Sequence, residues 1–460
     1  MKSIEEIIAG GRSASDVIFD LKQKELRIKP WSKILLDYEP KFHQIVRDRS
    51  GRRDKVHNGE IERASRIHLG LEKLITKRAA EFTCAIPVRR QYGNVGEDAA
   101  KQDVMTAIES IFKHARIDSE NLERSVNLYA SCEMCTVWYT VESPNNLYGF
   151  ESKYKLKCAT YSPMDGVLLY PLFDEREDLV AISMEYRRLV LNERVTFFET
   201  YTRDRHIRWR FSAGSPELEM DEPIKLGKIP AIYAYRREPI FEGLSHLRNE
   251  IEYTLSRNSD VVAYNSAPIL KVAGAISGAE QKGESRRIVR VDNGGDVSYV
   301  SWAQSNEAVK YHVDTLLSLF FKLSQMPDIS FEKMSSLGQI GYDARKTLFT
   351  DAHLKIGDIA APMVEFLDRE VNVVKAFLKL MRPEWSATID AMDVESVITP
   401  YVQDDEQQTV TRLMQANGGK ALLSHLDSIR MYGKSSDPQA TLDRINSEEA
   451  AASMSNQFEY

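Results

Sequence analysis

The feature that most constrains this fold is a helical pattern that runs without a break from residue 343 to residue 382. Apolar residues recur there at intervals of three or four, which is the spacing of one helix face. Asp343 can cap the start of this helix, and Pro383 marks its end. At 1.5 Å per residue the helix is roughly 60 Å long, more than one compact domain needs. Its apolar positions are Leu348, Ala352, Ile356, Ile359, Met363, Phe366, Val371, Val374 and Phe377.

A glycine-containing loop precedes this long helix. An apolar helical pattern at 305–325 ends before Pro327, and serines and glycines then replace the regular apolar spacing. Gly338 and Gly341 can adopt backbone angles that are closed to other residues, so they are the natural hinges. Loops of this length usually have a function or are disordered.

A small insert of strands separates two helical patterns in the second half of the chain. Residues 241–266 predict one helix, and residues 267–304 carry short β-branched runs typical of strands. Asn293 and Gly294 predict a tight hairpin turn within 286–302. The insert is basic, unlike the chain as a whole. Its basic residues are Lys271, Lys282, Arg286, Arg287 and Arg290.

The first half of the chain predicts helices followed by a β-rich block. A polar start includes residues 47–63, which we interpret as an exposed basic connection. Helical spacing follows at 67–82 and at 98–115, and a third helix precedes a strand at 128–143. Successive strands with polar turns continue from there. The fold class is therefore α+β.

The composition of the chain limits the classes of function that it can have. The 460 residues carry a net charge of −7, so the chain as a whole does not attract nucleic acid, although DNA could pass it without being held. We find no signal peptide and no apolar run long enough to span a membrane. Four cysteines without a secretion signal predict free thiols in a reducing compartment. We expect a soluble, intracellular protein.

The sequence offers no convincing catalytic constellation. Cys132 and Cys135 form a CxxC pair, and with Cys84 and Cys158 they could supply four thiolates to zinc. Residues three apart on a strand point to opposite faces, so we expect buried free cysteines instead. We predict no catalytic residue, no metal and no cofactor.

Three stretches of the chain follow one another in an informative order, with the helices, the insert and the loop between them. They are ATYSPMDGVLLYPLFDEREDLVAISMEYRR at 159–188, LSQMPDIS at 323–330 followed by Gly341 and Ala344, and GGKALLSHLDSIRMYGKSSDPQATLDRINSEE at 418–449. This order resembles the portal proteins of tailed double-stranded DNA bacteriophages, in the shorter form typical of long-tailed phages. The likeness covers residues 57–450. The chain departs from the family at Ile340-Gly341, where Ser-Gly is common, and at Cys132, near which the family has glycine.

The resemblance implies a portal fold with an α/β wing, a two-helix stem, a small β-containing clip and a helical crown. The implied segments are 1–240 for the wing, 241–266 and 305–327 for the stem helices, 267–304 for the clip, 328–342 for the tunnel loop, 343–382 for the long wing helix, and 383–460 for the crown and C-terminal tail.

The resemblance also implies a structural function without catalysis. The family forms a homo-oligomeric ring, usually a dodecamer, at one capsid vertex of the virion, after synthesis in the host cytoplasm. Double-stranded DNA passes through the ring during packaging and ejection. Implied partners are the large subunit of terminase, a head-completion or adaptor protein, and the major capsid and scaffold proteins, with no membrane.

The resemblance assigns two groups of site residues. Those of the tunnel loop, expected to face DNA, are Ser330, Phe331, Glu332, Lys333, Met334, Ser335, Ser336, Leu337, Gly338, Gln339, Ile340 and Gly341. Those of the clip, expected to bind a partner, are Lys271, Lys282, Arg286, Arg287, Arg290 and Asn293.

Two other classes of protein remain as alternatives. A metal-dependent nuclease is suggested by PDISFEK at 327–333, although Glu332 and Lys333 are adjacent where the signature separates them by one residue. A helical scaffold or adaptor would explain the long helices but not the β insert.

Overall fold

The structure, a computed structural model, describes most of residues 4–457 and consists of two units. The first unit comprises residues 1–327 and 352–401, and the second comprises residues 328–351 and 402–460. The residues outside the description are 1–3, 9–10, 24–25, 50, 58–59, 94, 96–97, 213, 266–268, 274–275, 280–288, 292–295, 301–305, 329–348, 401–405, 419–420, 433–437 and 458–460.

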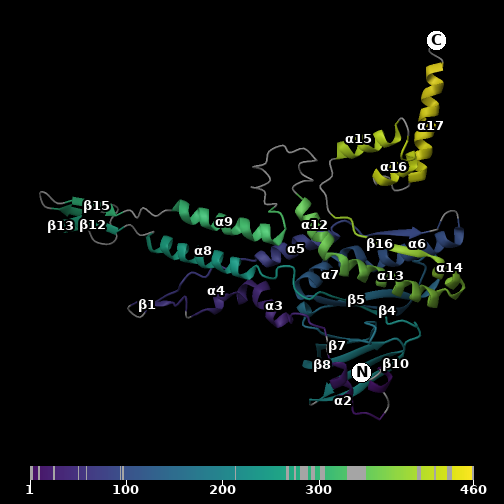
Figure 1. Ribbon diagram of the computed structural model, residues 1–460, viewed down its shortest axis with the longest axis horizontal. Coiled ribbons are helices and arrows are strands. Elements are labelled where there is room, and N and C mark those ends of the chain that lie inside the picture. Colours follow the sequence, from purple (N-terminus) through teal and green to yellow (C-terminus); the bar gives the residue numbers. More distant parts are fainter. Residues whose placement is uncertain are drawn as a thin grey trace. The chain divides into compact units, whose positions relative to one another are not determined.

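The two largest sheets in the described part of the first unit are antiparallel (Figure 1). In the smaller one, β4 (Glu133–Asn145) pairs with β5 (Ser152–Tyr161) on one side and with β11 (Ala231–Tyr235) on the other. The larger sheet is a meander in which each strand pairs with the next. Its strands are β6 (Leu168–Phe173), β7 (Leu179–Val190), β8 (Glu193–Thr202), β9 (Arg205–Ser212) and β10 (Ser215–Pro223).

The last three helices before the sheets, α5, α6 and α7, broadly confirm the predictions. α6 (Ala99–Ala115) begins where expected, because the Asp98 carboxylate accepts hydrogen bonds from the backbone N–H groups of its first turn. α5 (Leu71–Cys84) starts four residues later than predicted. α7 (Ile117–Ser131) continues past residue 128, so the prediction that a strand starts there was wrong. The strand begins at Glu133, after Cys132 ends the helix in a left-handed conformation.

The long C-terminal pattern forms two helices, so the prediction of one unbroken helix was wrong. α12 (Thr350–Ile359) and α13 (Ala361–Met381) are separated at Ala360. Pro362 explains the break, because it lacks an N–H and its ring would clash with the carbonyl four residues earlier. Pro383 ends α13 as predicted and opens the short helix η3 (Pro383–Trp385). Asp343 lies outside the described residues.

After η3 the chain remains in the first unit until residue 401. α14 (Ser386–Ala391) leads into β16 (Asp393–Val397), which pairs with β3 (Arg89–Gly93). α13 itself packs against β11 of the smaller sheet. These contacts bring segments from both ends of the chain together.

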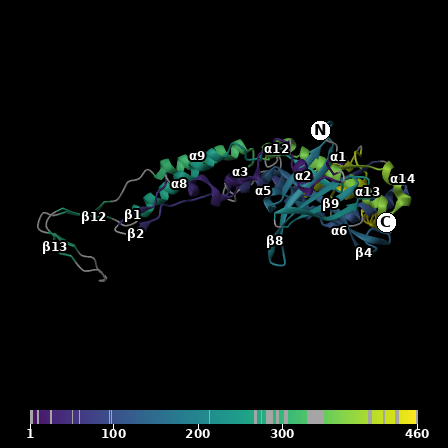
Figure 2. The ribbon, with the colours of Figure 1, turned by 90° about the horizontal axis from the view of Figure 1, so that it is seen from below.

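α8 (Ser245–Asn265) and α9 (Asn306–Ser324) pack side by side, as both Figure 1 and Figure 2 show. Their bounds confirm the two predicted helices, except that the first begins four residues late. The insert between them contains four short strands, which are β12 (Ile269–Ala273), β13 (Ile276–Ala279), β14 (Val289–Val291) and β15 (Asp296–Val300).

The strand pairing of the insert differs from the predicted hairpin. β15 pairs with β12, and β14 pairs with β13, so the two strands that flank Asn293 and Gly294 do not form a ladder with each other. The observed register sets Ile269 opposite Val300 and Val272 opposite Val297, and cross-strand pairs of β-branched residues favour such a ladder. The turn residues themselves lie outside the described residues.

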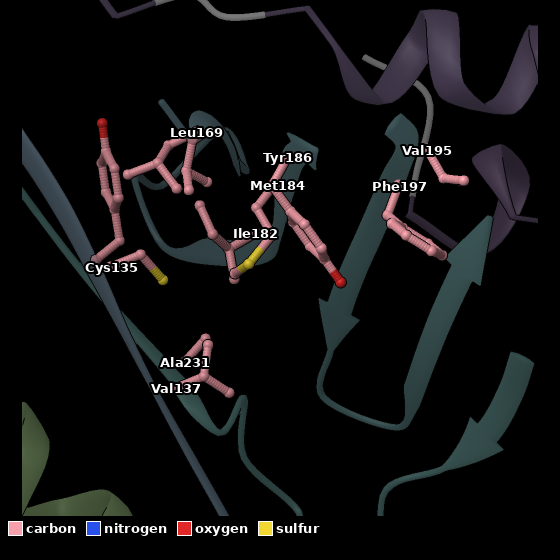
Figure 3. Close-up of a cluster of buried hydrophobic side chains, with 11 residues drawn as sticks. Cys135, Val137, Leu169, Ile182, Met184, Tyr186, Val195, Phe197 and Ala231 are labelled. Carbon is pink, nitrogen blue, oxygen red and sulfur yellow. The ribbon is translucent and has the colours of Figure 1, made fainter. Parts of the chain in front are cut away.

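One hydrophobic cluster joins the two sheets (Figure 3). Cys135 and Val137 of β4 pack with Ile182 and Met184 of β7, and all four are at most 2% exposed. The remaining buried members are Val167, Leu169, Tyr186, Val195, Phe197, Ala231 and Tyr233. The smaller sheet therefore covers one face of the larger sheet.

The opposite face of the larger sheet is covered by two N-terminal helices, α1 (Ile4–Ile7) and α2 (Ala14–Leu21). Leu21 packs with Phe198 and Trp209 there, whereas Phe197 belongs to the other cluster. Adjacent residues of a strand point to opposite faces, so β8 contributes to both cores.

Within residues 406–457, the described part of the second unit contains α15 (Glu406–Asn417), α16 (His425–Tyr432) and α17 (Pro438–Gln457). The alanine-rich sequence near the end of α17 favours helix. Of the helices in the described ranges, none combines the length and the apolar character needed to cross a membrane.

Candidate functional site

The structure describes few of the predicted site residues. Residues 330–341, predicted to face DNA, all lie outside the described ranges, as do Lys282, Arg286, Arg287 and Asn293 of the insert. Lys271 lies on β12, opposite Ser298, and Arg290 lies on β14, opposite Gly278. The structure therefore assigns these two basic residues to different strand pairs.

The helix α8, which leads into the insert, is held by a buried polar face. Arg248, Glu252 and Ser256 are each at most 1% exposed, and their spacing of four residues places them on one side of the helix. Asp260 continues the row. These four residues bond mainly to the segment 37–72, and we call the whole set of contacts the polar seam.

Arg248 forms the end of the polar seam nearest the start of α8. Its guanidinium donates to Glu72 Oε1 at 2.8 Å and to Asp37 Oδ1 at 3.0 Å, and a third bond reaches the side-chain oxygen of Asn249 at 3.0 Å. Burial raises the pKa of Glu72, and the charge of Arg248 opposes that shift. A buried guanidinium with carboxylate partners holds α8 firmly, because removing a carboxylate weakens the compensation of a buried charge.

A buried histidine occupies the middle of the polar seam. His43 Nδ1 lies 2.7 Å from Glu252 Oε1, and Nε2 lies 2.9 Å from the carbonyl oxygen of Asp37. The backbone N–H of Leu69 also donates to Glu252 Oε1, at 2.7 Å. A carbonyl oxygen can only accept, so Nε2 carries a proton. The short contact at Nδ1 requires a second proton, held by either the imidazole or the carboxyl group.

The far end of the polar seam uses backbone groups as well as side chains. The Ile67 N–H donates to Ser256 Oγ at 2.9 Å, and the Ser65 N–H donates to Asp260 Oδ1 at 2.8 Å. Arg52 pairs with Asp260 and is only 7% exposed. The prediction that residues 47–63 form an exposed connection was therefore wrong for Arg52.

α9 has both buried and exposed apolar side chains. Phe320 is fully buried, but Tyr311 is 75% exposed, Leu323 is 60% exposed and Leu319 is 41% exposed. Val262 of α8 is also exposed, at 55%. The apolar side chains of α9 are therefore only partly buried within the described residues. Uncovered apolar surface of this kind marks interaction sites.

A second buried ion pair holds α13 to the smaller sheet. Arg124 of α7 lies 3.0 Å from Glu370 Oε1 of α13, and both side chains are at most 1% exposed. The Trp138 Nε1–H of β4 donates to the same oxygen at 2.9 Å. Arg124 also donates to Asn121 and Thr160. One carboxylate thus connects a helix to two elements that precede it by more than two hundred residues.

The cysteines behave as buried thiols. Cys84, Cys132 and Cys135 are buried, which confirms the prediction for these three, whereas Cys158 is half-buried. Burial raises the pKa of Cys84 and of Cys158 to about 11, and that of Cys132 to about 12. Cys132 caps α7 and only Cys135 lies on β4, so the assumption that both lie on one strand was wrong. Across the described ranges, no group of three or more His, Cys, Asp or Glu side chains is arranged to hold a metal ion.

One family of known proteins matches most of the chain. A family model described as phage portal protein, SPP1 Gp6-like, matches residues 21–454. No curated protein sequence matches the chain. Among solved structures, the chain is similar to one from the neck of an empty GTA particle, computed with C6 symmetry. The two share 10% sequence identity with a TM-score of 0.42, over 93% of this chain and 97% of that one.

Proposed function

The chain belongs to the family of SPP1 Gp6-like phage portal proteins, and we propose that it forms the ring through which double-stranded DNA is packaged and ejected. Portal proteins are structural, and the fold is the α+β mixture of helices and sheets expected for one. The ring is at one vertex of the capsid, so the protein is a component of the virion.

The observation that carries this proposal is a group of exposed apolar side chains on α9. Tyr311, Leu319 and Leu323 have no partner in the described part of the chain that buries them. A head-to-tail contact between copies of the chain would cover these side chains. Such contacts close into a ring when the rotation from one copy to the next divides evenly into a full turn. That rotation sets the number of subunits in the ring, and we propose twelve.

The loop 328–342 is proposed to line the channel. Lys333 is its only basic residue, so the loop does not clamp phosphates and DNA can slide past it. Gly338 and Gly341 supply the hinges. The loop is therefore proposed as an adjustable constriction.

The insert 267–304 is proposed as the clip, the platform for the large subunit of terminase during packaging and for a head-completion or adaptor protein afterwards. Its basic residues favour acidic partners and accelerate their association. We propose α8 and α9 as the stem, the sheets with α13 as the wing that meets capsid and scaffold proteins, and residues 402–460 as the crown.

The deciding experiment is electron microscopy of the purified chain. We expect class averages of closed rings with a central hole, and native mass spectrometry should give one dominant oligomer. Monomers or dimers alone, at every concentration and salt tried, would overturn the proposal. A magnesium-dependent cleavage assay on the same sample should show no nuclease activity.

A further inference from the structure

The β7–β8 hairpin extends beyond the strands beside it, as Figure 2 shows near the β8 label. The ladder between β6 and β7 ends at the pair Leu168–Glu185, and the ladder between β8 and β9 ends at Phe197–Arg210. Residues 187–196 therefore pair only with each other. We call this two-stranded extension the arm. Val195 of the arm is buried in the cluster that joins the two sheets, and Val190 packs against that cluster. The outer end of the arm has no such support, and a two-stranded hairpin alone is marginally stable in water, so this end gains from a partner.

The tip of the arm is strained and apolar. Val190 pairs with Glu193, which leaves Leu191 and Asn192 as a two-residue turn with φ angles of 49° and 68°. Such turns favour asparagine or glycine, because both positions are left-handed. Leu191 is nevertheless 96% exposed, and Leu189 is 68% exposed. A strained apolar residue that contacts nothing in its own fold points to a function outside it.

The arm is also basic. Arg187, Arg188 and Arg194 are exposed, against one acidic residue, Glu193. This charge favours an acidic partner surface with an apolar spot for the leucines.

The edge strand β10 of the same sheet is acidic and carries an exposed apolar side chain. Among the described strands only β9 pairs with it, so its other edge has backbone groups that no described strand pairs with. It carries four acidic residues, and Leu218 among them is 58% exposed. Glu219 and Asp221 pair with arginines of β9, whereas Glu217 and Glu222 form no ion pair with any described residue. Its acidic row opposes pairing with another copy of β10 but accepts a basic strand.

We propose that the arm of one copy docks on β10 of the next copy, with Leu191 against Leu218 and the arginines against Glu217 and Glu222. The contact joins different surfaces of identical chains, so it is head-to-tail and adds a second interface to that of the helices. This inference rests on the proposed ring.

Disulfide trapping tests the contact directly. The double variant Leu191→Cys with Leu218→Cys should give, on mild oxidation, a ladder of covalently linked oligomers on a non-reducing gel. Each single variant should give none. The native cysteines are buried or half-buried and serve as the background in the unmodified chain. Rings without a ladder would overturn the arm contact alone, as would dimers from Leu191→Cys, which would indicate an arm-to-arm contact. Absence of rings from the unmodified chain would overturn the proposed function as well.

A charge swap provides a second, independent measurement. Arg188→Glu with Arg194→Glu should raise the protein concentration needed for half-assembly at least tenfold, and Glu217→Arg with Glu222→Arg should do the same. The chain with all four changes should assemble nearly as well as the unmodified protein. Failure of that rescue would overturn the pairing, and undiminished assembly of both double variants would assign the arm to another occupant, such as an acidic capsid protein.

The strained turn gives a third readout. Leu191→Gly removes both the strain and the exposed side chain, so the unfolding midpoint of the unassembled chain should rise while half-assembly needs more protein. A merely structural turn would not move the two measurements in opposite directions. Assembly unchanged by this variant would contradict the proposal.

Discussion

Replacing Glu370 with glutamine tests how α13 is held to the smaller sheet. The change keeps the shape of the side chain but removes the charge that faces Arg124 at 3.0 Å. Arg124 is then buried without a counter-charge, and removing one partner of a buried ion pair typically costs about 3–5 kcal/mol. We expect about 3 kcal/mol, since the glutamine oxygen can still accept the hydrogen bond from Trp138.

Urea unfolding followed by tryptophan fluorescence measures this loss, because Trp138 lies at the pair. With an m-value of about 3 kcal/mol/M, the midpoint should fall by about 1 M. The matched control is Glu365→Gln, one turn away on the same helix, where the side chain is 63% exposed and pairs with Arg369. An exposed pair of this type contributes below about 0.5 kcal/mol.

The result that refutes this reasoning is a midpoint for Glu370→Gln no lower than that for Glu365→Gln. A double replacement, Arg124→Met with Glu370→Leu, should restore most of the lost stability, because an apolar pair needs no counter-charge. If the double variant is less stable than the single one, packing at this position and not charge governs the cost.

Three further predictions concern the thiols, the loop and the insert. Because burial raises the pKa of Cys84 and Cys158 to about 11, their alkylation at pH 8 should be roughly a hundredfold slower than that of a free thiol. Alkylation should accelerate as the pH rises and in urea, and mass spectrometry should detect it; fast labelling of the folded chain would contradict the burial. Gly341→Pro fixes φ near −65° and should leave rings and proheads intact but stall packaging or let DNA leak. The length of DNA per prohead measures this effect. Normal packaging would show that the loop only connects two helices, and loss of the ring would show that the loop is needed for assembly. Replacing Arg286, Arg287 and Arg290 with glutamate should spare the rings and weaken terminase binding in a pull-down, and unchanged binding would refute the assignment of docking to the insert.

The sequence predicted elements well wherever one periodicity dominated. α6 and α9 are close to their predicted bounds, because apolar spacing and caps act locally. The break at Ala360 was missed, although Pro362 was visible. The apolar spacing continues through it, and apolar spacing was given more weight than the missing N–H.

The polar seam was not predictable from the same patterns. Arg248, Glu252, Ser256 and Asp260 recur at every fourth position, which is the pattern of a solvent-facing side of a helix. Their partners lie about two hundred residues earlier and carry no local signal of the pairing. Polar pairing between distant segments depends on the tertiary fold, so single-sequence patterns cannot reveal it.

The polar seam also sets an order of events during synthesis. The residues it joins are separated by 209 positions in the case of His43 and Glu252. At a ribosomal rate of about 5–20 residues per second, the early segment waits roughly 10–40 s before α8 emerges. During that time His43 and Arg52 remain hydrated, and closing so large a loop is slow compared with forming local helices. The N-terminal segment therefore docks late. A nascent chain stalled before α8 should leave residues 37–69 open to a protease that the finished chain resists.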